Sequence, residues 1–150
     1  MNKRLANNEK KELNTILEEK YNLHNYIDKK DLVDMQENII CVNNRRLFFY
    51  YETHLLPTLH LLLEKQVLKR ITVDMGAVKF VIKGADIMRP GITKIEDVIK
   101  KDDIIVIIDE THGKPLAIGK ALFDGETIKT MNSGKVIKNI HYIGDTIWRA

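Results

Sequence analysis

Residues 73–91, which read VDMGAVKFVIKGADIMRPG, contain the local signals that decide the fold. Ile71-Thr72-Val73 predicts a short strand that leads into this stretch, because these side chains favour extended backbone. The apolar pattern from Met75 to Lys83 predicts a short helix, and Gly84 can end that helix in a left-handed conformation. Pro90-Gly91 then turns the chain into a region that is mostly strand. The stretch therefore predicts a strand, a short helix and a glycine loop at the start of a β-rich region.

The residues after this stretch predict short strands joined by tight turns. Ile104 to Ile108 is an unbroken apolar run, typical of a strand that is buried on both faces. In residues 116–122 large side chains alternate with small ones, which suits a tightly curved barrel, and Gly119 allows a close backbone approach. Further elements are expected towards the end of the region: a hairpin turn at Asp124-Gly125 before a strand at Thr127-Ile128, and a last strand at Thr146-Ile147-Trp148.

The first part of the chain predicts a helix, a hairpin and a second helix. Apolar side chains recur at helical spacing from about Asn8 to Tyr21, as expected for a helix that covers a sheet. Two apolar runs flank Asn43-Asn44, and because Asn tolerates positive φ we expect a hairpin with a tight turn there. Pro57 is expected at the first position of a helix that continues to about Val67. The chain thus divides into a small mixed domain, residues 1–69, and a second domain, residues 70–150.

Net charge, cysteine content and the length of the apolar runs limit the classes of protein to which this chain can belong. The chain has 150 residues, and its 24 Lys and Arg against 21 Asp and Glu give a formal net charge of only +3. Binding to nucleic acid would therefore depend on the local placement of basic side chains. The single cysteine, Cys41, excludes an intrachain disulfide framework and favours a reducing compartment. The longest apolar runs are far shorter than a membrane span and the first 20 residues lack the apolar core of a signal peptide, so we expect a cytoplasmic protein that does not enter a membrane.

Residues 73–91 resemble the opening of a PUA domain, a family named for pseudouridine synthases and archaeosine transglycosylases. In that family a strand is followed by Gly-Ala, a short apolar helix, a second Gly-Ala and a Pro-Gly, and Gly76-Ala77, Gly84-Ala85 and Pro90-Gly91 match that order. Leu116 to Ala121 is similar to the family's strand with an embedded glycine, and residues 139–148 are similar to its end. The resemblance implies an α+β protein in which a small mixed α/β N-terminal domain packs on a C-terminal PUA β-pseudobarrel.

A narrower resemblance includes the N-terminal half. The residues from about Ile39 to Trp148 are similar to the malignant-T-cell-amplified-sequence family of translation proteins; the N-terminal motifs are Val42-Asn43, Leu47-Phe48-Phe49, Pro57-Thr58-Leu59 and Leu61-Leu62. Members of that family bind the small ribosomal subunit and help to place or release tRNA in initiation and recycling, and eukaryotic members work with a density-regulated partner protein. The resemblance implies binding to structured RNA (tRNA or rRNA) rather than DNA, and leaves open whether this chain has such a translation-factor partner.

The RNA-binding surface of PUA domains falls on residues whose chemistry suits that role. Lys79 and Lys83 are four positions apart on the expected helix, and we expect a compact loop to return Arg89 beside them, where all three cations could bind phosphates. The same charges could equally lie on an ordinary solvated helix face. The complete set of expected RNA-binding residues is Lys79, Phe80, Lys83, Gly84, Ala85, Asp86, Met88, Arg89, Pro90, Gly91 and Lys135.

The aromatic residues allow two interpretations. Phe80 could stack on an RNA base, but because the chain has only four Phe residues a core position is favoured. Trp148 is likewise expected to be buried. Arg45-Arg46, at the expected hairpin turn, could bind rRNA, but an exposed turn explains both residues equally well.

Catalytic and metal-binding motifs are not recognisable in the sequence. His54 and His60 are six positions apart and do not share a helix face, and Cys41 lies in an apolar run typical of a core thiol. We therefore expect no enzymatic activity, no cofactor and no metal. Two alternatives to a role on the ribosome stay open: an accessory module that targets an RNA-modifying enzyme on another chain, and a protein-interaction adaptor that acts through its N-terminal domain.

Overall fold

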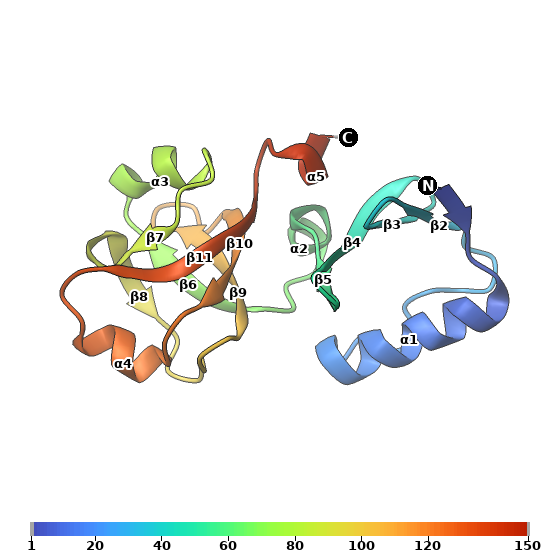
Figure 1. Ribbon diagram of the computed structural model, residues 1–150, viewed down its shortest axis with the longest axis horizontal. Coiled ribbons are helices and arrows are strands. Elements are labelled where there is room, and N and C mark those ends of the chain that lie inside the picture. Colours follow the sequence, from blue (N-terminus) through green and yellow to red (C-terminus); the bar gives the residue numbers. More distant parts are fainter. Residues whose placement is uncertain (1, 150) are drawn as a thin grey trace. The chain divides into compact units, whose positions relative to one another are not determined.

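The computed structural model describes residues 2–149 and divides into two compact units, Met1–Val67 and Leu68–Ala150 (Figure 1). Each unit has its own sheet and its own cluster of buried apolar side chains.

The first unit combines an antiparallel sheet with two helices. Within residues 2–67 the elements are, in chain order, β1 (Asn2–Arg4), α1 (Asn7–Tyr21), β2 (Val33–Gln36), β3 (Ile39–Val42), β4 (Arg45–Tyr51), β5 (His54–Pro57) and α2 (Leu59–Glu64). The strands lie in the order β1-β2-β3-β4-β5, and each pairs antiparallel with the next. Asn43 and Asn44 have φ of 52° and 67°, so the predicted tight turn between β3 and β4 is confirmed.

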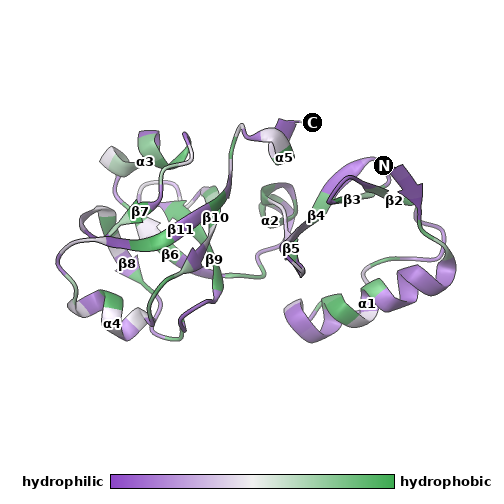
Figure 2. Ribbon diagram, viewed as in Figure 1, coloured by the Kyte–Doolittle hydropathy of each residue, from purple (hydrophilic) through white to green (hydrophobic). Residues whose placement is uncertain are grey.

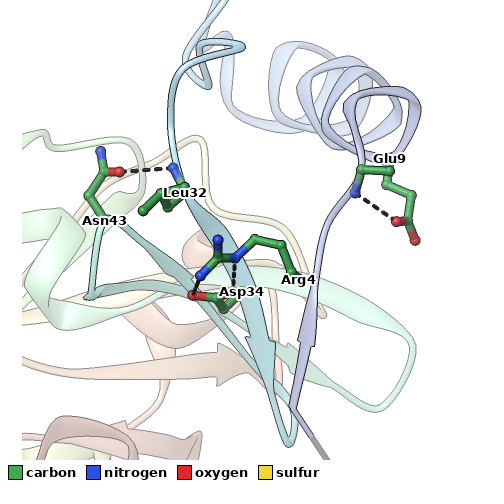
Figure 3. A network of polar contacts seen from close by, with 6 residues as sticks. Arg4, Glu9, Leu32, Asp34 and Asn43 are labelled. Carbon is green, nitrogen blue, oxygen red and sulfur yellow. Dashed lines mark hydrogen bonds and ion pairs between the residues drawn. The ribbon is translucent and has the colours of Figure 1, made fainter.

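Helix α1 packs through a narrow apolar stripe, as its sequence spacing predicts. Leu13 and Leu17 are buried, and most other residues of the helix are polar, so Figure 2 shows α1 as mainly hydrophilic with short hydrophobic patches. The chain before the helix is fixed by polar contacts (Figure 3). Glu9 Oε1 accepts the backbone N–H of Ala6 at 2.9 Å, and the Arg4 guanidinium pairs with Asp34 across β1 and β2.

The expectation that Pro57 begins a helix is wrong. Pro57 is the last residue of β5 and lies opposite Phe48 of β4, and both residues are buried. The helix starts after Thr58, whose hydroxyl accepts the backbone N–H of Leu61 at 3.3 Å, and it ends at Glu64. Either Pro57 or Thr58 could mark the start of the helix. Because Pro57 pairs with β4 as part of β5, the helix begins only after Thr58, which caps it.

The second unit is a curled sheet with short helices. Within residues 68–149 the elements are, in chain order, β6 (Lys69–Val73), α3 (Met75–Val81), β7 (Ile87–Met88), the 3-10 turn η1 (Arg89–Gly91), β8 (Ile92–Ile95), β9 (Ile104–Asp109), β10 (Pro115–Ala121), α4 (Gly125–Thr130), β11 (Lys135–Tyr142) and α5 (Thr146–Arg149). The strand order is β7-β11-β10-β9-β6-β8, with β6 and β9 parallel and the other pairs antiparallel.

The connection between the two outer strands explains why this sheet curls. β7 and β8 lie at opposite ends of the strand order, yet only the three residues of η1 separate them in the chain. A link of three residues spans about 10 Å at most, so the sheet must bend until its two edges approach one another. The expected α+β protein with a β-pseudobarrel is therefore confirmed.

The expected close backbone approach at Gly119 is also confirmed. A Cβ atom at Gly119 would lie 2.5 Å from Ile137 Cγ2 and 2.8 Å from the backbone oxygen of Lys138, on the neighbouring strand β11. The pairing of β10 with β11 shifts register between Ile118 and Gly119, as expected at a bend in a barrel strand. Only glycine fits at this point of the sheet.

The two strands expected near the end of the chain are helices instead. Both edges of β10 are already paired, with β9 and β11, so the residues after Asp124 cannot fold back on β10 as a hairpin and form α4. The Asp145 carboxylate accepts the backbone N–H of Trp148 at 2.9 Å and thereby begins α5. Trp148 is partly buried rather than buried as expected.

Candidate nucleic-acid interface

Helix α3 begins and ends by contacts that its own sequence supplies. Asp74 Oδ1 accepts the backbone N–H of Ala77 at 2.8 Å and caps the first turn. The helix ends at Val81, two residues earlier than expected, so Lys83 lies in the following turn rather than on the helix face of Lys79. Gly84 has a φ of +92°, so the predicted left-handed glycine is confirmed.

Gly84 is also a point of close contact with β11. A Cβ atom at this position would lie 2.8 Å from Cε1 of the Tyr142 ring. Tyr142 is half-buried and packs against the core of the second unit. Glycine therefore serves two purposes here, since it permits the backbone conformation and leaves room for the ring.

Asn139 of β11 holds the loop that follows α3. Its side-chain Nδ2 donates to the backbone oxygens of Val81 at 3.1 Å and Ala85 at 3.0 Å, and its backbone N–H donates to Asp86 Oδ1 at 2.8 Å. In the sequence, Asn139 is only the first residue of the stretch 139–148 that resembles the end of a PUA domain, and it was not expected as a site residue. Its partners lie more than 50 positions away in the chain, so no local pattern could assign this role.

A cavity of about 430 Å³ lies between α3 and the chain that runs from Ala85 to η1. The backbone N–H of Asp74 donates to the oxygen of Gly91 at 2.9 Å and ties the start of the helix to the end of that chain. The wall is largely apolar, and its residues are Asp74, Gly76, Ala77, Phe80, Val81, Ala85, Asp86, Ile87, Met88, Pro90 and Gly91. Its size and lining are those of a site that takes a small organic group.

Phe80 lies in the wall of this cavity and not in the core, so the expected core position is wrong. The residue is 57% exposed, and Met88 on the opposite wall is 50% exposed. Helix α3 is short and directs Val81 into the barrel, which places the preceding Phe80 towards solvent. The Lys79 ammonium lies 5.2 Å from the centroid of the Phe80 ring, a cation–π contact that brings a positive charge to the aromatic wall.

Arg89 does not lie beside the lysines as expected. Its Nε donates to the backbone oxygen of Ile128 at 2.7 Å, and its Nη1 donates to that of Ile92 at 3.2 Å. The Ile128 carbonyl lies near the end of α4, where helix oxygens need partners from outside the helix. Arg89 therefore connects α4 to the chain beyond η1.

Lys135 and Asp86 form an ion pair beside the cavity. Lys135 Nζ lies 2.9 Å from Asp86 Oδ2, and the Lys135 side chain is 54% exposed. Of the residues expected to bind RNA, those that line the cavity are Phe80, Ala85, Asp86, Met88, Pro90 and Gly91. Gly84 is not among the lining residues and packs against Tyr142, and Lys83 is exposed in the adjoining turn.

Neither a metal centre nor a membrane span is found in the part of the chain that the structure describes. Residues 2–149 contain no group of three or more His, Cys, Asp or Glu side chains placed to hold a metal ion. No helix within the same residues is both long and apolar enough to cross a membrane.

The comparison with protein families matches residues 69–143 to the PUA domain. An uncharacterized protein of Methanocaldococcus jannaschii is 41% identical over 144 residues, which cover 93% of this chain and 87% of that protein. Malignant T-cell-amplified sequence 1 of Rattus norvegicus is 36% identical over 84% of this chain and 75% of its own length. Translation machinery-associated protein 20 of Eremothecium gossypii is 36% identical over 117 residues, which cover 73% of this chain and 65% of that protein.

Solved structures superpose on nearly the whole chain or on a part of it. A hypothetical protein from Pyrococcus horikoshii superposes with a TM-score of 0.80 at 32% identity, covering 99% of this chain and 98% of the other. The archaeal box H/ACA sRNP Nop10-Cbf5 complex contains a chain that superposes with a TM-score of 0.51 at 27% identity, over 60% of this chain and 28% of that one.

Proposed function

Because the chain belongs to the PUA-domain family that includes Translation machinery-associated protein 20 and Malignant T-cell-amplified sequence 1, we propose that it binds structured RNA, tRNA or rRNA, in translation. The proposed place of action is the small ribosomal subunit, during initiation or recycling. The RNA-binding surface is the cavity beside α3 together with the lysines next to it.

The exposed aromatic wall of the cavity is the observation that carries this proposal. An exposed Phe80 and an exposed Met88 on the two sides of a largely apolar cavity leave hydrophobic surface in water, which is typical of a binding site. A base stacked on an aromatic ring contributes about 1–3 kcal/mol of binding free energy. Lys79 places a positive charge 5.2 Å from the centroid of the same ring, and its long, exposed side chain can reach the phosphate of a nucleotide that binds there.

Few charges are available for phosphate, so RNA binding should depend moderately on salt. Lys79, Lys83 and Lys135 are exposed and lie in or next to the site, whereas the guanidinium of Arg89 bonds backbone oxygens. Neutralising about three phosphates gives a slope of roughly −2 to −3 when the logarithm of the binding constant is plotted against that of the salt concentration.

A pair of charge reversals with a matched control tests the site. Lys79→Glu/Lys83→Glu changes the net charge by −4, and so does Lys100→Glu/Lys101→Glu, in the exposed loop between β8 and β9 of the same unit. We expect the first pair to weaken tRNA binding at least about tenfold and to abolish co-sedimentation with the small subunit, because reversed charges repel phosphate at short range. The control pair should retain both. The lysines of α1 would not serve as a control, because Lys10 is buried and its ammonium donates to the backbone oxygen of Lys29 at 2.9 Å.

Three outcomes would contradict the proposal. Equal weakening by both pairs would indicate a general electrostatic effect without a site. RNA binding that survives the first pair would move the interface away from α3. Co-purification with an RNA-modifying enzyme in place of the small subunit would support an accessory role in modification.

A further inference from the structure

The wall of the cavity contains two acidic side chains, although the ligand proposed for this site is a polyanion. Asp86 lines the cavity from the chain after Gly84, and Asp74 lines it from the start of α3. Asp74 is explained locally, since its carboxylate caps the helix. Asp86 caps no helix, and a carboxylate beside RNA phosphate is unfavourable unless the group that enters the cavity is a neutral part of the RNA.

The contacts of Asp86 keep it an anion that can accept further hydrogen bonds. Partial burial by itself would raise the pKa of Asp86, but the backbone N–H of Asn139 and the ammonium of Lys135 outweigh that effect and hold the pKa below its usual value. An ionised carboxylate is purely an acceptor, with about four lone-pair directions on its two oxygens. Asn139 and Lys135 account for one direction on each oxygen, which leaves acceptor capacity for a ligand.

We propose that the cavity takes a single unpaired nucleobase and that Asp86 selects bases that carry an exocyclic amino group over uracil. This inference rests on the proposed function and specifies which part of the RNA the site recognises. Phe80 and Met88 supply the apolar walls, and the Asp86 carboxylate accepts the amino N–H at the edge of the base. Uracil presents two carbonyl oxygens beside its N–H, and their lone pairs repel a carboxylate.

The Asp86–Lys135 ion pair is compatible with this selection. Lys135 is largely exposed, and exposed ion pairs contribute little to stability, so its ammonium can turn to a phosphate of the bound strand. Lys79, above Phe80, is placed for a phosphate on the side of α3. The negative charge then faces the base, and the positive charges face the backbone.

Short single-stranded oligocytidylate and oligouridylate of equal length, labelled with fluorescein, are the probes for this proposal. They carry the same backbone charge and differ in the amino or carbonyl group of the base. We expect wild-type protein to bind oligocytidylate about tenfold more tightly in fluorescence anisotropy, as for a hydrogen bond to a charged group. In Asp86→Asn the ratio of the affinity for oligocytidylate to that for oligouridylate should fall to about one or two, because an amide can present either a donor or an acceptor. Asp97→Asn is the matched control, since Asp97 also pairs with a lysine, Lys129 of α4, and lies outside the cavity.

The outcomes separate this inference from the proposed function. A cytidine preference that disappears in Asp86→Asn and persists in Asp97→Asn supports the inference. Equal binding of the two oligonucleotides by wild-type protein overturns it, and so does a preference that Asp86→Asn retains. Failure of both oligonucleotides to bind while tRNA binds overturns the base pocket and leaves the proposed function intact, whereas failure of all RNAs overturns both. If Asp86→Asn does not fold, the wild-type comparison still decides.

Discussion

Gly84 and Gly134 provide a pair of substitutions whose difference isolates one contact. Their φ values, +92° and +93°, are nearly the same, and both disfavour a residue with a Cβ atom. At Gly84 a Cβ would lie 2.8 Å from the Tyr142 ring, whereas at Gly134 no atom lies within 4 Å. Alanine at either position therefore has the same backbone cost, and only alanine at Gly84 must also displace the ring.

The expected magnitudes follow from these two contributions. The backbone conformation costs about 1–2 kcal/mol at each position. Displacing Tyr142, which packs against the core, adds overpacking strain of about 1–3 kcal/mol in Gly84→Ala alone. The effect of alanine on the unfolded chain is the same in both variants and cancels. In a unit of this size, 1 kcal/mol corresponds to roughly 4–8 °C in Tm, so Gly84→Ala should melt at least about 4 °C below Gly134→Ala.

Trp148 fluorescence is the suitable assay, because the chain has a single Trp and it lies in the second unit. Thermal and urea unfolding followed at this residue report the unit that contains the two glycines. Equal losses in the two variants would refute the role of the Tyr142 contact. Unchanged stability in both variants would refute the positive φ values themselves.

Two further results are expected. Phe80→Ala should lower RNA affinity about 5- to 150-fold while changing the free energy of unfolding by less than about 1 kcal/mol, since the ring is exposed; a large loss of stability would instead indicate a core position. Burial would raise the pKa of Asp145, but the His141 imidazole and two backbone N–H groups outweigh it and lower that pKa. The stabilisation from Asp145 is therefore complete above the ordinary Asp pKa of about 4 and is lost as pH falls through the pKa of Asp145 in the folded state. In Asp145→Asn the free energy of unfolding should therefore decrease less steeply as the pH is lowered through this acid range.

Sequence patterns predicted those elements whose cause is local. The apolar stripe of α1, the Asn43-Asn44 turn and the Gly84 loop depend on side chains within a few positions of each other, and all three are confirmed. Asp124-Gly125 and Thr146–Trp148 carry signals that suit a turn or strand as well as a capped helix. The choice depends on which strand edges are already paired, and a local pattern does not contain that information.

In the candidate site, too, the features with a local cause were predicted and those set by distant residues were not. The motif at residues 73–91 located the helix, the glycines and the chain that encloses the cavity. The positions predicted for the Arg89 and Phe80 side chains are wrong. A backbone carbonyl of α4 fixes the Arg89 side chain, and the position of Phe80 depends on which face of a short helix meets the barrel. Asn139 was missed as a positioning residue because its partners lie far away in the sequence.

The hydrogen bonds of Asn139 also have a consequence for the order in which the molecule matures during synthesis. The ribosome adds Asn139 54 residues after Ala85, the loop residue that it holds. Residues 2–67 have their own sheet and core, so the first unit can fold while the second is still being made. Helix α3 and its loop, by contrast, emerge early without the strand that fixes them. The nascent chain therefore completes the surface proposed to bind RNA as one of the last steps of folding, when β11 closes the barrel.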